Sequence, residues 1–176
     1  MNADDLKKVL AAHKLWLESN GNKGKRADLS GAYLAGENLF NANLKRANLK
    51  RANLSDAILL GADLSDSNLS GANLAGADVT AANLSGTDLT AANLRGANLR
   101  RAKLRDAKLT SAYLSRANLS GANLSRANLL GARLTHADFT DANLEGADYT
   151  AAINPNFAGA HTPNSWVPCA CSICAA

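Results

Sequence analysis

The residues with the clearest chemical potential are three cysteines near the C-terminal end of the chain. Cys169, Cys171 and Cys174 lie within the sequence CACSIC. Three thiolates at this spacing could bind a soft metal ion such as Cu(I) or Zn²⁺, but a closed zinc site takes four ligands, and the nearest further candidate is His161. A redox role is also open, because Cys171 and Cys174 have C-x-x-C spacing, although nothing predicts the helix N-terminus at which such a pair normally reacts.

The segment around these cysteines differs in composition from the rest of the chain. Residues 151–176 contain all three prolines and all three cysteines, and no Asp, Glu, Lys or Arg. Proline opposes helices and central strands, so we expect residues 153–176 to form an extended, flexible tail. A folded region followed by such a tail looks like the architecture of ribosomal peptide precursors, in which a modifying enzyme recognises the folded region as a leader. On that hypothesis the modified side chains are Cys169, Cys171, Ser172 and Cys174. A tail without any chemical role is the remaining alternative.

The elements that precede this tail follow a five-residue period. Leucine returns at every fifth position from Leu29 to Leu144, except at Val79 and Phe139, and the series ends at Tyr149. Alanine generally lies two residues before each of these positions, and Asn or Asp one residue before. A step of five suits neither an α-helix, around which successive leucines would rotate, nor a strand, on which they would alternate between faces. The period instead predicts a closed coil of four sides, in which residue i lies beneath residue i+20 and every leucine points to the axis.

The repeat A-[N/D]-L-x-x over about residues 26–152 resembles the pentapeptide-repeat family. The resemblance implies an all-β solenoid, namely a right-handed quadrilateral β-helix of about six coils, with residues 26–152 as the repeat domain. We expect residues 1–25 to form an N-terminal capping helix and loop, and residues 153–176 to form the C-terminal tail. The family implies little about chemistry, since its members range from topoisomerase-binding DNA mimics to proteins of no known role.

Both ends of a stacked coil expose apolar side chains and unpaired backbone groups, so each end needs a cover. Residues 3–19 have apolar side chains near one helical face and acidic residues early in the segment, which predicts a covering helix. His13 is on or beside that face, and we interpret it as a packed histidine because no cysteine or second histidine is close in sequence. At the other end we expect Phe157 or Trp166 to fold back on the last coil.

Three residues replace the alanine of the repeat, and each would place a polar side chain inside the coil. Ser67 and Thr87 are one predicted coil apart, so we expect their hydroxyl groups to hydrogen-bond to each other inside the wall. A lone buried carboxylate is costly, so we expect Glu37 to face the capping segment and to meet a base there. The candidate bases are Lys23, Lys25 and Arg26.

The charge of the repeat region is segregated, although the whole chain has a net charge of only +4. Residues 52–94 contain acidic residues and no base, whereas the bases of residues 95–133 are opposed by Asp106 alone. Six of these bases fall close together and form what we call the basic collar, which comprises Arg95, Arg100, Arg101, Lys103, Arg105 and Lys108. The collar is either a solvated surface or a binding site for an anionic partner. No aromatic residue is interleaved with it in the sequence, which weighs against nucleic acid.

The predicted stacking also places side chains of successive coils one above another on the outer walls. The expected pairs are Asp88 with Lys108, Asp106 with Arg126, and Tyr113 with Arg133. Exposed ion pairs contribute about 0–1 kcal/mol each, so we interpret these contacts as adjustments of register and not as functional sites.

No residue set in the sequence supports an enzyme. We expect the three histidines, His13, His136 and His161, on the helix, an outer wall and the tail, and the glycines follow the five-residue period instead of forming a phosphate-binding loop. We therefore expect a non-catalytic cytoplasmic scaffold without cofactor or membrane contact, whose walls bind a protein partner. A peptide-modifying enzyme is one candidate partner. The peptide precursor is the alternative function, and a topoisomerase-binding DNA mimic is third because the longest charged belt is basic. End-to-end pairing of two rods stays open.

Overall fold

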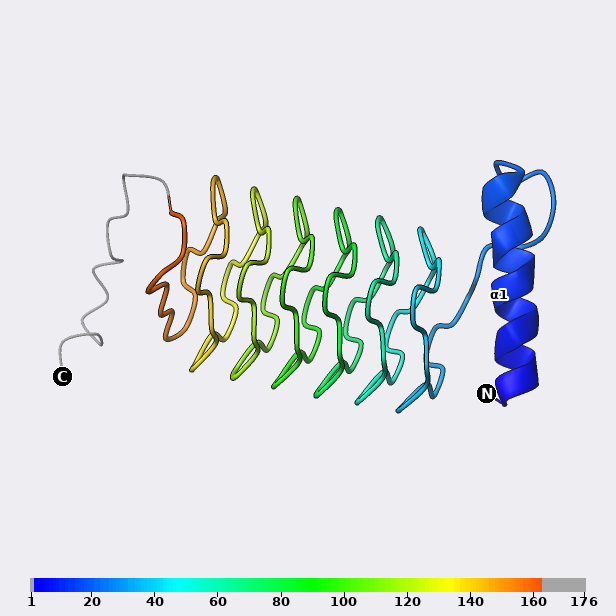
Figure 1. The fold of residues 1–176 in the computed structure, drawn as a ribbon, viewed down its shortest axis with the longest axis horizontal. Helices are drawn as coiled ribbons and strands as arrows, with labels where there is room; N and C mark the ends of the chain where they lie inside the picture. The colour runs from blue at the N-terminus through cyan, green and yellow to red at the C-terminus, as the bar shows by residue number, and fades with distance from the viewer. Residues whose placement is uncertain (1, 163–176) are drawn as a thin grey trace.

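The computed structural model describes residues 2–162, which form an N-terminal helix followed by a regular stack of coils (Figure 1). Helix α1 spans Ala3–Glu18, which confirms the predicted helix to within one residue. Its first turn is stabilised because the Asn2 side chain accepts a hydrogen bond from the Asp5 N–H (2.8 Å). Asp4 and Asp5 also lie at the positive end of the helix dipole. No helix in this part of the chain is long and apolar enough to cross a membrane.

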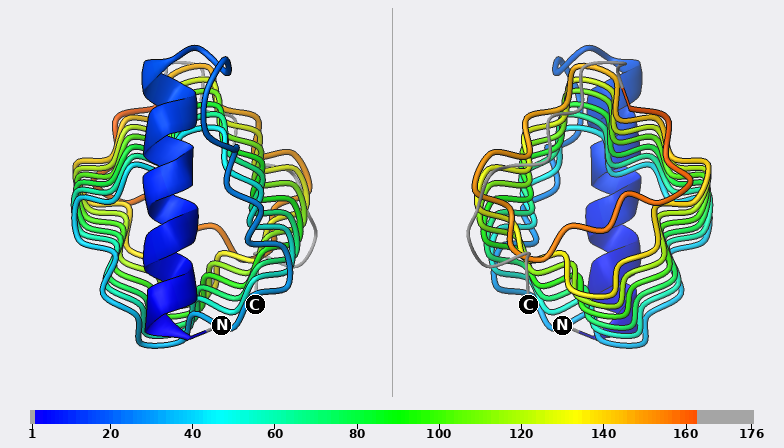
Figure 2. Two further views of the ribbon diagram at one scale, coloured as in Figure 1. Left: turned by 90° about the vertical axis from the view of Figure 1, so that its right-hand side faces the viewer. Right: turned by 90° about the vertical axis from the view of Figure 1, so that its left-hand side faces the viewer.

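Successive coils pair in parallel with an offset of twenty residues. The β-bridges keep this offset from Asp28 with Asn48 to Arg133 with Ile153. Backbone hydrogen bonds join the same coils, as from the Leu29 N–H to the Asn48 carbonyl (2.7 Å). The predicted stacking of residue i beneath residue i+20 is therefore confirmed, and Figure 2 shows the coils superimposed in views along the stack.

The leucines and alanines of the repeat fill the interior of the stack. The leucine positions from Leu29 to Leu144 are at most 2% exposed, and Val79 and Phe139 are buried in the same columns. Each fully buried leucine contributes roughly 1.5–3 kcal/mol of transfer free energy, and the small alanines leave room for these side chains. This burial is the main favourable term that opposes the chain entropy lost on folding.

Each side of a coil ends in a type II turn. The alanine N–H donates to the leucine carbonyl three residues earlier, as from Ala97 to Leu94 (3.1 Å). The third residue of the turn has a positive φ at every corner from Gly31 to Ala151. Many of these corners carry Arg, Asp, Ala, Asn, Ser or His instead of glycine. A residue with a side chain has a conformational cost of roughly 1–2 kcal/mol in this region, so the corners oppose the stability that the core provides.

The asparagine that precedes many of the leucines stabilises both its own turn and the adjacent coil. Asn73 accepts the Ala75 N–H at Oδ1 (3.2 Å) and donates from Nδ2 to Asn53 Oδ1 (3.1 Å). Asn93 repeats the second contact toward Asn73 (2.9 Å). These local hydrogen bonds explain the preference for Asn at an outward position.

Helix α1 lies across the N-terminal end of the stack (Figures 1 and 2). Leu6 of the helix is buried in the same core as the leucines of the coils, and Val9 and Leu10 pack against that core. At the other end the Phe157 ring centroid lies 5.0 Å from that of Phe139 and 5.0 Å from that of Tyr149. The expected folding back of Phe157 is thus confirmed, whereas Trp166 lies outside the described residues.

The predicted contact between Ser67 and Thr87 is wrong. Thr87 Oγ1 donates instead to the Leu64 carbonyl (2.7 Å), and Ser67 Oγ is buried without a hydrogen-bond partner among the described residues. The register places these residues one above the other, but the nearby carbonyl is the acceptor that the Thr87 hydroxyl reaches. Ser67 therefore carries a desolvation cost that alanine at the same position would not have.

Two expected ion pairs are also absent within residues 2–162. Glu37 is only half-buried and pairs with none of the predicted bases, Lys23, Lys25 and Arg26, because its carboxylate does not need a buried partner. Asp88 and Lys108 are bridged through their backbones but form no ion pair. The Asp88 carboxylate instead accepts the Thr90 N–H (2.9 Å), which is a hydrogen bond within its own coil.

Candidate partner-binding surface

The basic collar lies on the outer surface of one turn of the stack. Its six side chains are all exposed, namely Arg95, Arg100, Arg101, Lys103, Arg105 and Lys108. The bridges between Asn83 and Lys103 and between Asp88 and Lys108 place the collar directly above the acidic stretch 52–94. The inward positions are taken by leucine and alanine, so the bases must occupy the positions that face solvent.

Tyr113 lies within this basic surface, which corrects the expectation that no aromatic residue is interleaved with the bases. Arg95 Cζ lies 4.7 Å from the centre of the Tyr113 ring, and Arg133 Cζ lies 5.0 Å from it. The predicted contact with Arg133 is confirmed. The contact with Arg95 was missed because it is diagonal: Tyr113 pairs with Asn93, two residues before Arg95. Such cation–π contacts contribute about 0.5–1 kcal/mol at exposed sites.

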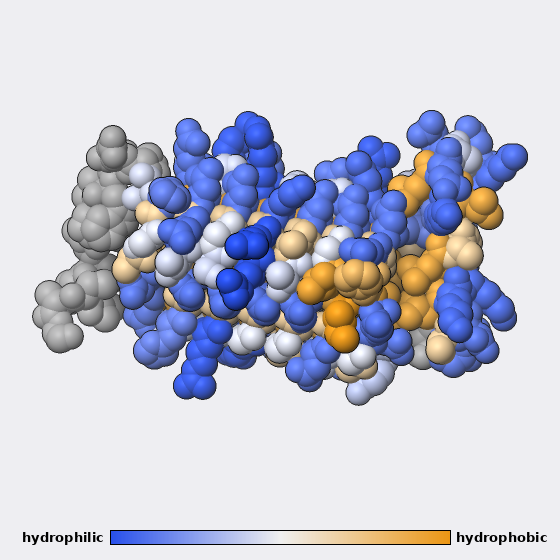
Figure 3. Space-filling view, in the orientation of Figure 1, coloured by the Kyte–Doolittle hydropathy of each residue, from blue (hydrophilic) through white to orange (hydrophobic). Residues whose placement is uncertain are grey.

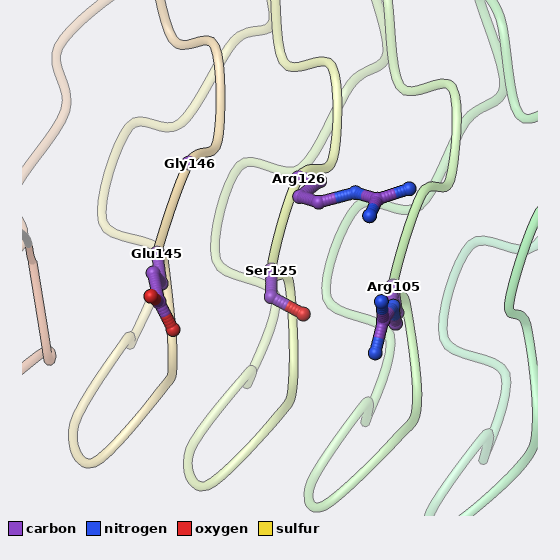
Figure 4. Close-up of a pocket in the computed structure, with 5 residues that line it drawn as sticks. All are labelled: Arg105, Ser125, Arg126, Glu145 and Gly146. Carbon is purple, nitrogen blue, oxygen red and sulfur yellow. The ribbon is translucent and has the colours of Figure 1, made fainter.

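A small recess opens beside the collar, next to Asp106 (Figure 4). Arg126 Nε donates to Asp106 Oδ1 (2.7 Å), which confirms the predicted pair, and Arg105 Nε lies 3.4 Å from Asp106 Oδ2. The recess has a volume of about 310 Å³ and is lined by Arg105, Ser125, Arg126, Glu145 and Gly146. Figure 4 shows Arg126 extended along the stack toward the coil of Arg105. The side chains of Asp106, Arg105 and Arg126 are exposed, so their two ion pairs contribute about 0–1 kcal/mol each.

Two acidic residues on coils close to the collar, Asp78 and Asp138, are held by hydrogen bonds of their own turns. The hydroxyl and N–H of Thr140 lower the pKa of Asp138, and the charge of Arg100 lowers it further. Asp78 accepts the Thr80 hydroxyl (2.6 Å) and, on the next coil, Asn98 Nδ2 (3.4 Å). The carboxylates of Asp78 and Asp138 are therefore engaged by hydrogen bonds within their own walls, and they leave most of the positive charge of the collar unneutralised.

His13 is a buried residue of the interface between α1 and the stack, as expected. Its Nδ1 accepts the Ala27 N–H (3.1 Å), and its ring stacks on Trp16 with centroids 5.7 Å apart. Burial lowers the pKa of His13, the Lys45 backbone raises it, and the charge of Arg26 lowers it. A packed imidazole that accepts a backbone N–H is a structural group, since a charged form would lose this hydrogen bond and would be buried as a cation.

The remaining chemical candidates do not converge within the described residues. His136 is exposed at a corner, and His161 pairs through its backbone with Asn143 at the C-terminal end of the stack. Residues 2–162 contain no group of three His, Cys, Asp or Glu side chains that could hold a metal ion. The predicted modification or metal residues lie outside the described part of the chain, namely Cys169, Cys171, Ser172 and Cys174.

A family model described as pentapeptide repeats matches the chain in eight copies. The matched segments are residues 25–59, 47–86, 72–110, 82–121 and 112–148. Together they span residues 25–148, whereas the β-bridges extend further, to Ile153 and His161. No curated protein matches the chain.

Solved structures of pentapeptide repeat proteins are similar to the chain. HetL, involved in heterocyst differentiation regulation in the cyanobacterium Nostoc sp. strain PCC 7120, is 37% identical, with 77% of this chain and 70% of HetL covered and a TM-score of 0.62. A protein of the Arabidopsis thaliana thylakoid lumen is 29% identical, with 68% and 66% covered and a TM-score of 0.30. QnrB1, a plasmid-mediated fluoroquinolone resistance protein, is 23% identical, with 78% and 79% covered and a TM-score of 0.41. Of these three, HetL supports the shared fold.

Proposed function

The chain belongs to the pentapeptide repeat family, whose members form right-handed quadrilateral β-helices, and we propose that it is a non-enzymatic scaffold whose walls bind a protein partner. In this proposal residues 26–152 form about six coils, and residues 1–25 cap the first of them. Helix α1 and Phe157 lie against the two ends of the stack, which leaves the walls as the surfaces open to a partner.

The observation that supports the proposal is the uncompensated charge of the basic collar. All six side chains are exposed, yet within residues 2–162 only Arg105 forms an ion pair, with Asp106. Concentrated charge of one sign attracts partners of the opposite sign and speeds their association. The collar therefore favours an acidic protein surface as partner. The same charge weighs against the topoisomerase-binding DNA mimic, which requires an acidic rod.

The proposal is tested by crosslinking and mass spectrometry in the native host. The collar variant carries, at each position, a residue type that a neighbouring coil has in the same column: Arg95→Ser, Arg100→Thr, Arg101→Gly, Lys103→Asn, Arg105→Ser and Lys108→Asn. The control removes four bases outside the collar and also uses residue types of the same columns, with the glycine at position 46 taken from Gly86, two coils away: Lys45→Ser, Arg46→Gly, Lys50→Ser and Arg51→Gly. We expect a protein partner that is crosslinked to the wild type and the control but not to the collar variant. Equal crosslinking of all three, or of none, contradicts the proposal.

The predicted tail of residues 153–176 is shortened, because residues 153–162 pair with the last coils, as Ile153 does with Arg133 and His161 with Asn143. In this proposal residues 163–176 are the tail that the scaffold presents. The alternative, in which the repeat domain is the leader of a modified peptide, makes a different prediction for the same residues. Fragment mass spectrometry of the protein from its native host distinguishes the two. A mass shift within residues 162–176, or a cleaved tail, would support the precursor and identify a modifying enzyme as partner, whereas an unmodified tail with free thiols supports the scaffold.

A further inference from the structure

One wall of the stack carries three neighbouring apolar side chains that face solvent. Phe40 is 55% exposed and Ile58 is 43% exposed, and Leu60 is half-buried beside them. They belong to adjacent coils, because Asn38 bridges with Ile58 and the Asn41 N–H donates to the Leu60 carbonyl (3.0 Å). In Figure 3 an apolar patch of this kind is orange on the half of the stack nearer to α1.

The fold does not require apolar residues at these positions. The column of Ile58 continues with Asp78 and Asn98, and the column of Phe40 and Leu60 continues with Thr80. Polar residues in these columns form the same turns, as in the hydrogen bond from the Thr80 N–H to Asp78 (3.1 Å). An exposed apolar cluster that the repeat does not need is typical of a binding surface.

The same wall becomes basic further along the stack. Hydrogen bonds connect Gly61 N–H to the Thr80 carbonyl (3.0 Å) and Ala81 N–H to the Arg100 carbonyl (2.8 Å), so Phe40, Leu60, Thr80 and Arg100 follow one another on successive coils. Arg101 directly follows Arg100 and is the positive-φ residue of the same turn. With about 4.8 Å between coils, the backbone of Arg100 and Arg101 lies three coils, or about 14 Å, from the Phe40 level.

Acidic residues on the same wall limit the number of consecutive acidic residues that a bound ligand can have. Asp78, between the apolar and the basic levels, is engaged by Thr80 and Asn98. Beyond the arginines the wall becomes acidic again, since Asp138 and Asp141 lie on a later coil. A long acidic stretch would meet these carboxylates, whereas a short acidic pair matches the basic level alone.

We propose that this wall docks a protein segment that carries an aliphatic or aromatic pair and, a few residues away, two adjacent acidic residues. In an extended segment, at about 3.3 Å per residue, the 14 Å interval corresponds to about four residues. The apolar pair packs on Phe40, Ile58 and Leu60, and the acidic pair binds Arg100 and Arg101 by charge-assisted hydrogen bonds. This assignment rests on the proposed function, because it specifies which wall the protein partner contacts and which chemistry it presents.

The test uses random dodecapeptides displayed on phage, selected on the immobilised full-length protein. Selected peptides are then synthesised and their affinities measured by fluorescence anisotropy. We expect a shared pattern of an apolar pair and an acidic pair three to five residues apart. Selected peptides without this pattern contradict the inference.

Matched variants locate the binding. The apolar variant combines Phe40→Ser, Ile58→Asn and Leu60→Thr, all of them residue types present in the same columns, and Leu130→Thr is its control on another wall. The charge variant combines Arg100→Thr and Arg101→Gly, with Arg116→Gly as its control. We expect the apolar and charge variants to bind the peptides at least about tenfold more weakly and the controls to remain near the wild type. Thermal unfolding verifies that each variant is folded.

The outcomes separate this inference from the proposed function. Peptides that bind the apolar variant as tightly as the wild type overturn the inference. If such peptides are acidic and depend on Lys103 and Arg105, the collar still binds an acidic ligand and the proposed function stands. If no peptide is selected, the inference is wrong, and the crosslinking experiment decides the proposed function by itself.

Discussion

His13 Nδ1 accepts the backbone N–H of Ala27 at 3.1 Å, and this hydrogen bond joins α1 to the first coil of the stack. The acceptor role requires that Nδ1 carry no proton, so the contact exists only with the neutral ring. The ring is fully buried, which adds a desolvation cost to its charged form. The attachment of the helix is therefore linked to pH.

The first prediction concerns this linkage. Burial lowers the pKa of His13, so below the unfolded value of about 6.5 the unfolded chain binds a proton that the folded chain does not. Stability is then complete above this value and falls as the pH decreases toward the folded pKa, by up to about 1.4 kcal/mol per pH unit. Denaturant unfolding at pH 7.5, 6.5 and 5.5 measures the effect, with His13→Phe as a variant whose stability should change less over this range. Equal wild-type stability at pH 7.5 and 5.5 would contradict the linkage.

The second prediction concerns the corners. Ala81 and Ala91 both have φ of 55°, where glycine is free of the strain of a side chain. We expect Ala81→Gly and Ala91→Gly to raise the free energy of unfolding by up to about 1 kcal/mol each. The reverse change, Gly96→Ala, should lower it by a similar amount, although an added Cβ would meet no atom within 4 Å. If Gly96→Ala is neutral in thermal unfolding, the strain account of the corners is wrong.

The third prediction concerns the two hydroxyl groups inside the wall. Ser67 Oγ is buried without a partner among the described residues, whereas Thr87 Oγ1 donates to the Leu64 carbonyl. We expect Ser67→Ala to stabilise the protein by about 1 kcal/mol, because it removes an unsatisfied hydroxyl. Thr87→Val should destabilise it by about 0.5–1.5 kcal/mol, because the Leu64 carbonyl loses the hydroxyl donor and keeps only the Ser67 N–H. Urea unfolding of the two variants should therefore give shifts of opposite sign, and shifts of the same sign would refute this explanation.

The fourth prediction concerns the C-terminal end of the stack. Phe157 is half-buried and contacts the rings of Phe139 and Tyr149. We expect Phe157→Ala to cost about 1–3 kcal/mol and to speed amide hydrogen exchange of the last coil, with little change near α1. Phe157→Leu should retain most of the protection, because it keeps an apolar side chain in place. Uniform loss of protection along the whole rod would instead indicate that the stack unfolds as one unit.

The sequence predicted the repeat architecture well, because a single geometric constraint determines it. Every leucine from Leu29 to Leu144 has to reach the axis, and this requirement sets both the five-residue side and the twenty-residue offset. The pairs Tyr113 with Arg133 and Asp106 with Arg126 followed from the offset alone.

The predictions that were wrong depended on side-chain direction, which the offset does not determine. Asp88 and Lys108 have the correct register, but the Asp88 carboxylate accepts the nearer N–H of Thr90. Thr87 and Ser67 are stacked, yet the backbone carbonyl of Leu64 is the acceptor. The contact of Arg95 with Tyr113 is diagonal between columns, and a comparison of residues twenty apart does not find it.

The twenty-residue offset determines which changes in chain length the walls tolerate. A duplication of one whole coil would lengthen the rod by about 4.8 Å and leave every wall in line. An insertion of five residues between Phe40 and Arg100 would preserve the repeat and its buried leucines, yet it would rotate everything downstream by a quarter turn. Phe40 and Arg100 would then face different directions. A surface that spans several coils is therefore preserved only when insertions and deletions are complete coils of twenty residues. The repeat itself tolerates any multiple of five residues.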